Sequence, residues 1–244
     1  LINQTRLDAE TKGIKFIYGT PNEQSLPGYE KKANFKTIKD IHVRSMSLPV
    51  NISPIISRHS HWLLGEVIGY IYSIIFSSFY ELKKLSNITR ATKEINEIDI
   101  IPDGWDDFWA EAHKKHDFIF ARDLKSIEWR FINHPNKYKF YILKLHNELI
   151  GYLTYRIQYE KGITSLVIAD YLLLGGSENK LELLLFKVLE DAIKENVTTI
   201  NVWCPEGSPY FNIFKKFRFI SGNKVPVICF QNDFSCELNE SGIK

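Results

Sequence analysis

The chain has 244 residues, of which 44% are hydrophobic and 25% are charged. At about 150 residues per domain, this length corresponds to one or two domains with a sizeable buried core. The formal net charge of +2 is too small to indicate nucleic acid as the main partner. The cysteines, Cys204, Cys229 and Cys236, are odd in number and lack a C-x-x-C spacing. They argue against a disulfide framework, so we expect a cytoplasmic protein.

The first predicted elements are a strand, a turn, a short helix and a second strand. Residues 14–20 are apolar and rich in aromatic and β-branched side chains, which predicts the first strand. The segment "PNEQSLPG" carries four turn-forming residues and predicts the turn. A helix is expected through 28–33 and a strand through 36–48.

This pattern recurs near the other end of the chain. The segment "YGTPNEQSLPGYEKKANF" (18–35) aligns without a gap on "VWCPEGSPYFNIFKKFRF" (202–219). The alignment places Pro21 on Pro205, which is an offset of 184 residues. Because it keeps a strand, a proline, a helical segment and a basic-aromatic ending in order, we interpret it as a degenerate internal repeat.

Residues 49–92 are of a different kind. They contain an uncharged run from Val67 to Tyr80, whereas a membrane span needs ~20 largely apolar residues. The expected structure is a buried or interfacial connecting helix. The alternative is weak contact with a membrane surface through residues 62–82, whose aromatic side chains would lie at the headgroups.

From about Ile95 the pattern is that of a compact α/β domain. A strand at 95–101 is followed by two helices, and the second must end before Pro135. Three strands come next, at 137–145, 148–159 and 163–174. Because the joins between them are short, we expect antiparallel neighbours.

The clearest helix of the chain follows those strands. Its apolar residues form one stripe, made of Leu181, Leu184, Leu185, Val188, Leu189 and Ala192. A strand at 198–204, a short helix and a final strand at 225–230 complete the predicted order β-α-α-β-β-β-α-β-α-β.

That order resembles the GNAT acyltransferase superfamily. The segment "RDLKSIEWRFINHPNKYKFYIL" also resembles the Arg…Trp-Arg-Phe…His-Pro…Tyr signature of a bacterial GNAT-like group near the Fem-type tandem enzymes. The matching residues are Arg122, Trp129, Arg130, Phe131, His134, Pro135 and Tyr138. The resemblance implies an α/β (α+β) fold with a mixed, mostly antiparallel sheet flanked by helices, preceded by a partial second GNAT-like unit.

The resemblance also implies domain boundaries. Residues 1–48 are expected to be the C-terminal remnant of a first domain that is truncated at its N-terminus. Residues 49–92 would be an apolar helical linker, 93–235 the GNAT-like domain and 236–244 a tail.

In this family the fourth strand and the helix after it hold acyl-CoA, so acetyl-CoA or another acyl-CoA is the expected co-substrate. The positions implied here are Leu172, Leu173, Gly175, Gly176, Ser177, Asn179 and Lys180. Backbone N–H groups at a helix N-terminus favour phosphate. The sequence departs from the family here, because no register supplies the Gln/Arg-x-x-Gly-x-Gly/Ala fingerprint. The alternative is a plain strand-to-helix turn with Ser177 as N-cap.

Acyl transfer to an amine needs a base and an acid. Family members often place a tyrosine acid where this chain has Phe214, so Tyr210, one helical turn earlier, becomes the candidate acid. The alternative is that Tyr210 is a packing aromatic. Asp170, the only carboxylate in its apolar strand, is the candidate base or amine ligand. The alternative is a structural ion pair with Arg156 or Arg130.

The acceptor would be an amine of a small metabolite, sugar or peptidoglycan-type molecule, and Arg122, Trp129 and Arg130 are its candidate ligands. The alternative for these residues is packing and ion pairing. No metal is expected, because neither "HSH" (59–61) nor His113 and His116 have a completing ligand. A catalytically silent GNAT-like binding or structural module is the alternative function. The sequence predicts no oligomeric state.

Overall fold

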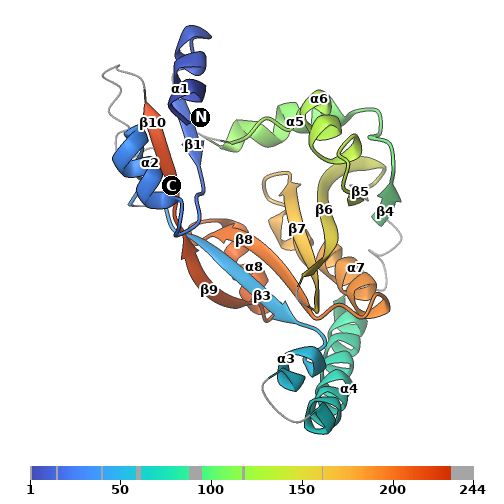
Figure 1. Ribbon diagram of the computed structural model, residues 1–244. Helices are drawn as coiled ribbons and strands as arrows, with labels where there is room; N and C mark the ends of the chain where they lie inside the picture. Colours follow the sequence, from blue (N-terminus) through green and yellow to red (C-terminus); the bar gives the residue numbers. More distant parts are fainter. Residues whose placement is uncertain are drawn as a thin grey trace. The chain divides into compact units, whose positions relative to one another are not determined.

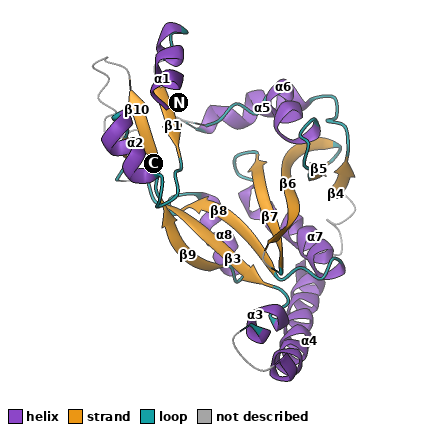
Figure 2. Ribbon diagram, viewed as in Figure 1, coloured by secondary structure: helices purple, strands orange, loops and turns teal. Residues whose placement is uncertain are grey.

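The computed structural model describes residues 2–14, 16–39, 41–58, 62–87, 95–116, 119–160 and 162–231 (Figures 1 and 2). Its helices are α1 (Ile2–Thr11), α2 (Leu26–Ala33), α3 (Ser53–Ser57), α4 (Trp62–Asn87), α5 (Trp105–Ala112), α6 (Leu124–Ile127), α7 (Leu181–Lys194) and α8 (Pro209–Lys216). Shorter turns are η2 (His113–Lys115), η3 (Glu128–Ile132) and η4 (Glu178–Lys180). Its strands are β1 (Phe16–Gly19), β2 (Lys36–Thr37), β3 (Val43–Pro49), β4 (Ile95–Ile98), β5 (Lys139–Leu145), β6 (Glu148–Glu160), β7 (Ile163–Leu173), β8 (Thr199–Pro205), β9 (Ile220–Val225) and β10 (Ile228–Gln231).

The chain forms two compact units that are both discontinuous in sequence. Unit 1 consists of Leu1–Ser45, Trp203–Phe211 and Ser221–Lys244, and unit 2 of Met46–Val202 and Asn212–Ile220. The predicted domains 1–48 and 93–235 do not match these units. The reason is long-range strand pairing, because β10 from the end of the described chain pairs antiparallel with β1 and β2. The predicted tail, 236–244, lies outside the described residues.

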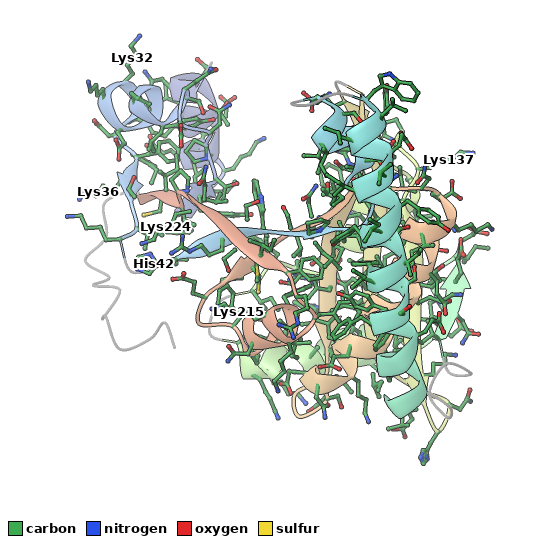
Figure 3. The ribbon with its side chains drawn as sticks, turned by 90° about the horizontal axis from the view of Figure 1, so that it is seen from below. Lys32, Lys36, His42, Lys137, Lys215 and Lys224 are labelled. Carbon is green, nitrogen blue, oxygen red and sulfur yellow. The ribbon has the colours of Figure 1, made fainter. Side chains whose placement is uncertain are left out.

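Unit 1 is built on the three-stranded sheet β1-β10-β2. Its core consists of Ala33, Phe35 and Ile228, and Tyr29 of α2 packs edge-on against Phe35 with ring centroids 5.3 Å apart. Arg44 and Glu206 form an ion pair in this unit, with Nε 2.6 Å from Oε1. His42 and Lys224, both labelled in Figure 3, approach each other to 3.5 Å between Nδ1 and Nζ.

The two segments aligned in the sequence have the same order of elements in the structure. The first copy is β1-α2-β2, and the second is β8-α8-β9. Both helices are followed by a residue with left-handed backbone, Asn34 (φ 56°) and Arg218 (φ 73°), which the alignment places on each other. Each is followed by a buried phenylalanine, Phe35 or Phe219. The likeness between the two segments therefore extends to the helix ends.

The larger sheet has the strand order β4-β5-β6-β7-β8-β3-β9. The pairs β4–β5, β5–β6 and β6–β7 are antiparallel, whereas β7 and β8 are parallel. The predicted tight turn between β5 and β6 is confirmed, because His146 and Asn147 both have positive φ. A mixed, mostly antiparallel sheet flanked by helices is therefore the fold class, as the sequence predicted.

Helices cover both faces of this sheet in unit 2. Phe140, Ile142 and Tyr152 belong to a core with Trp105 and Phe108 of α5, which lies on one face. Side chains alternate along a strand, so the intervening Tyr141 points to the other face. There its hydroxyl donates to Asp191 of α7 at 2.6 Å. The stripe predicted for α7 is buried as expected.

Helix α4 differs in part from its predicted environment. The prediction was a buried or interfacial helix, and the helix is not buried, because only 17% of its apolar segment Trp62–Glu81 is buried. The interfacial interpretation stays a prediction. Figure 3 shows the α4 ribbon along its whole length. The helices α1 and α3 and the strand β9 were not predicted. Strand β9 is almost wholly exposed and contains Gly222 and Asn223, residue types that are depleted in strands.

Candidate functional site

The candidate site begins where β7 leaves its parallel partner. The ladder between β7 and β8 consists of Ser165–Thr199, Leu166–Ile200 and Val167–Asn201. Strand β7 continues to Leu173, and over 168–173 it remains paired with β6 on its other side. The second half of β7 therefore extends past the end of its β8 ladder. Leu172 and Leu173, both predicted to bind cofactor, lie in that half and have buried side chains.

A β-bulge lies just beyond the end of that ladder. Thr154 pairs with Asp170 and Tyr155 with Ile168, which leaves Ala169 as the extra residue on β7. Ala169 is exposed, whereas Ile168 and Asp170 on either side of it are buried. Bulges of this kind re-aim the backbone and are frequent beside active sites.

The loop after β7 contains the predicted phosphate cradle. Gly176 has φ +88°, a backbone conformation that favours glycine. Its N–H donates to Oε2 of Glu178 at 2.8 Å. A carboxylate of the chain therefore occupies one of the N–H groups expected to bind phosphate. Ser177 is the N-cap residue of η4, as the alternative interpretation predicted, although its side chain makes no cap hydrogen bond.

Lys115 covers the other glycine of the loop. A Cβ atom on Gly175 would lie 2.3 Å from Cδ and 2.6 Å from Nζ of Lys115, so a larger residue here would displace the end of this lysine side chain. Lys180, predicted to neutralise phosphate, is half-buried at the start of α7, and Asn179 beside it is exposed. Two lysines and the Gly176 N–H thus lie on or beside this loop, with Glu178 as the opposing charge.

Asp170 is held in a buried ion pair. Its carboxylate accepts two short bonds from Arg122, at 3.0 Å from Nε and 2.7 Å from Nη2. The Tyr152 hydroxyl donates to it at 2.9 Å, and the Tyr171 N–H at 3.0 Å. Arg130 adds a longer contact at 3.5 Å.

The predicted partners of Asp170 were thus right in part. Arg130 is confirmed, but Arg156 is wrong, because its guanidinium donates to Gln158 instead. The principal partner is Arg122, which the sequence assigned to an acceptor. Both carboxylate oxygens of Asp170 have donors, and this geometry supports the structural ion-pair interpretation over a free base.

The ionisation of this cluster is coupled. Burial alone lowers the pKa of Arg122, but Tyr152 and Asp170 more than offset this and raise it above its usual value. Burial also raises the pKa of Tyr152 well above its usual value, and the Asp170 charge raises it further. Arg122 therefore stays charged and Tyr152 stays neutral and able to donate.

The Trp-Arg-Phe signature divides between core and surface. Phe131 is buried, and Tyr138 packs edge-on against it with ring centroids 5.1 Å apart. Trp129 is 76% exposed, on the π-helical turn η3. Of the three predicted acceptor ligands, Trp129 faces solvent, Arg130 is partly exposed and Arg122 is held by Asp170.

The candidate acid and the candidate base belong to different compact units. Tyr210 is buried and belongs to unit 1, whereas Asp170 belongs to unit 2. Phe214, at the family's tyrosine position, is fully buried and packs edge-on against Tyr171 of β7 at 5.3 Å. Its aromatic ring fills core space where the family often has a proton donor.

Metal ligation finds no support within the described ranges. No group of three or more His, Cys, Asp or Glu side chains there is arranged to hold a metal ion. The segment 59–61 lies outside the described residues.

The fold was compared with known proteins. No protein-family model and no curated protein matches the sequence. A GCN5-related N-acetyltransferase from Anabaena variabilis is similar over 94% of this chain and 49% of its own, with 9% identity and a TM-score of 0.53. The chain has the GNAT fold.

Two further solved structures support this. A conserved protein from Enterococcus faecalis, described as a probable N-acyltransferase, matches with 11% identity and a TM-score of 0.55 over 94% of this chain and 48% of its own. Saccharomyces cerevisiae N-myristoyltransferase with bound myristoyl-CoA matches with 10% identity and a TM-score of 0.51 over 78% of this chain and 48% of its own. The chain spans about half the length of these GNAT-fold proteins.

Three residues of the site were missed by sequence reasoning. Tyr152 and Lys115 come from distant segments, and only the fold brings them to Asp170 and Gly175. Glu178 stood inside the loop itself. An acidic side chain two residues after a glycine of positive φ was the one local signal available.

Proposed function

We propose that the chain is a GNAT-like N-acyltransferase domain, transferring an acyl group directly from an acyl-CoA to an amine. The acceptor is a small metabolite, a sugar or a peptidoglycan-type molecule, and acetyl-CoA is the simplest donor. The observation that carries the proposal is β7, which runs on beyond its ladder with β8 and bulges at Ala169. A strand that runs on past its ladder with a parallel neighbour supports the addition of an extended chain such as pantetheine.

The residues around β7 fit the parts of acyl-CoA. The pantetheine arm would lie along the β7 backbone over 168–173. The phosphates would meet the Gly176 N–H, with Lys115 and Lys180 as counter-charges. The exposed backbone at Ala169 is the candidate to hold the carbonyl oxygen as negative charge develops on it.

The chemistry balances without a covalent enzyme intermediate. The amine nitrogen forms a bond to the thioester carbonyl carbon, the carbon–sulfur bond breaks, and the sulfur leaves with its electron pair. The amine loses one proton, and the thiolate gains one. Asp170 and Tyr210 remain the predicted residues for these transfers, although the contacts of Asp170 favour a positioning role.

A second candidate function is a catalytically silent GNAT-like module. Two observations favour it: Phe214 takes the position of the family's acid, and both oxygens of Asp170 are already bonded. A silent module would bind acyl-CoA or a partner without releasing free thiol.

Calorimetric titration of the full chain with acetyl-CoA tests the proposal. Glu178 and a phosphate would compete for the Gly176 N–H, so Glu178→Gln should tighten binding by about tenfold, or ~1.4 kcal/mol. Glu148→Gln, at an exposed glutamate in the β5–β6 hairpin, is the control and should leave affinity unchanged.

The outcomes separate the candidates. Binding together with thiol release in the presence of amines supports the transferase. Binding without thiol release for any amine class tried supports the silent module. No heat and no thermal shift at millimolar acetyl-CoA, for the wild type and Glu178→Gln alike, would contradict both uses of the loop.

A further inference from the structure

Helix α4 has one face packed against the protein. Gly65 and Gly69 lie against α3, while Phe76 and Tyr80 are buried further along the helix. The Tyr80 ring packs on Phe217 with centroids 5.2 Å apart, and its hydroxyl donates to the Phe217 carbonyl at 2.6 Å. These contacts hold α4 along the side of unit 2.

The opposite face of α4 is exposed and apolar. Its side chains include Leu64, Val67, Ile68, Ile71, Ile74 and Ile75. Val67 is 57% exposed and Ile75 is 64% exposed, far more than side chains on a core helix. At about 100° per residue, the exposed apolar arc covers roughly half of the circumference of the helix.

Charge is nearly absent from the Trp62–Tyr80 part of this helix. Between Trp62 and Tyr80 the sequence has one charged residue, Glu66, and the segment Trp62–Glu81 has a mean hydropathy of 1.4. A helix that is apolar on all sides belongs in a protein core or in lipid. A core is excluded, because 17% of this segment is buried.

The length and the packing of the helix both match a lipid environment. The 20 residues of this segment extend for about 30 Å, which gives a long apolar face to lie along a bilayer surface. Gly65 and Gly69 meet Ser57 and Ser53 of α3, and a Cβ on either glycine would come within 2.0 Å of a serine oxygen. Small residues four apart on both helices are typical of helix pairs in membranes.

We propose that α4 is a monotopic membrane-docking helix. Its exposed arc lies among the acyl chains at a bilayer surface, while the Phe76–Tyr80 face keeps it attached to the protein. A second copy of the chain fits less well, because a protein partner covers a stripe and adds polar contacts around it. Lipid acyl chains can cover a broad apolar arc and need neither a narrow stripe nor polar contacts around it.

Because this docking is hydrophobic, it should not depend on lipid charge or on salt, and a vesicle-binding experiment can test this. The full chain should co-sediment with vesicles of neutral phosphatidylcholine, and high salt should not release it. Replacing two arc residues in the variant Ile71→Asp/Ile75→Asp should weaken partitioning by about 100-fold, since each buried isoleucine contributes about tenfold or more.

The matched control is Ile100→Asp/Ile220→Asp, at two isoleucines that are also strongly exposed but lie outside α4. This variant should sediment with vesicles like the wild type. Melting curves of both variants should overlay the wild type, because all four positions are exposed.

Three results would overturn the proposal. The first is a wild type that stays in the supernatant. The second is equal sedimentation of the two double variants. The third is a concentration-dependent dimer that Ile71→Asp/Ile75→Asp abolishes without any vesicle binding, which would assign the arc to a second copy.

Discussion

At the residue scale, Asp170 shows how far sequence reasoning reaches. A lone carboxylate in an apolar strand was correctly expected to need either a function or a partner. Its partner could not be chosen from three arginines by sequence, because Arg122 lies 48 positions away and only the fold of α6 and η3 brings it close. We therefore interpret the Asp170–Arg122 ion pair as structural, holding the segment before α6 against β7.

The substitution Asp170→Asn tests this role. It leaves the charge of Arg122 buried without its partner, so we expect a loss of about 3 kcal/mol in the free energy of unfolding. Urea denaturation measures it, and Asp107→Asn, at an exposed aspartate, is the control. Full stability combined with a large loss of kcat would instead make Asp170 a catalytic residue.

The tyrosines around Asp191 predict an alkaline limit to stability. Burial, followed by their hydrogen bonds to Asp191, raises the pKa of both Tyr141 and Tyr155 above the usual 10.0. The unfolded chain ionises these tyrosines near pH 10, whereas the folded chain keeps them neutral. Their contribution to stability is therefore complete below pH 10 and is lost as the pH rises above it.

Tyr155→Phe should flatten this alkaline fall, at the cost of about 1 kcal/mol near neutral pH for the lost hydrogen bond. Denaturant unfolding from about pH 8 to 11 measures both effects. The exposed Tyr159 supplies the control Tyr159→Phe, which should follow the wild type. Parallel curves for Tyr155→Phe and the wild type would show that Tyr155 has no part in the fall.

At the element scale, local patterns predicted much of the fold. The α7 stripe and the β5–β6 turn were predicted from the sequence, because each depends on neighbouring residues. The π-helical turn η3 was not, because its hydrogen bond from Asn133 to Glu128 spans one residue more than an α-helix requires. The extension of β7 beyond its ladder with β8 likewise could not be predicted from the sequence, since strand pairing is a tertiary property.

The α3–α4 contact gives a prediction at this scale. Gly69→Ala places a methyl group 1.8 Å from Oγ of Ser53, so the two helices must separate. We expect a loss of about 1–3 kcal/mol in stability, the usual cost of overpacking, measured by thermal or urea unfolding. Adding Ser53→Gly should restore part of the loss, because it removes the clashing oxygen. Equal stability of Gly69→Ala and the wild type would show that α3 and α4 are not held this closely.

At the scale of the whole molecule, the two compact units are discontinuous in sequence, whereas the predicted domains were continuous segments. Composition changes marked 49–92 as a linker, but the pairing of β10 with β1 and β2 joins segments from opposite ends of the described chain. The fold class was nevertheless predicted, since it follows from the order of elements in 95–231. The exposed face of α4 and the β7 edge are two independent surfaces, one proposed for lipid and one for acyl-CoA.

The central claim is that β7 and the loop after it hold an acyl-CoA. Hydrogen–deuterium exchange of the full chain with and without saturating acetyl-CoA tests it most directly, because exchange is read along the backbone. The account predicts slower exchange confined to 168–181, with the β5–β6 hairpin unchanged as internal control. Unchanged exchange across 168–181, or protection elsewhere in the chain alone, would contradict it.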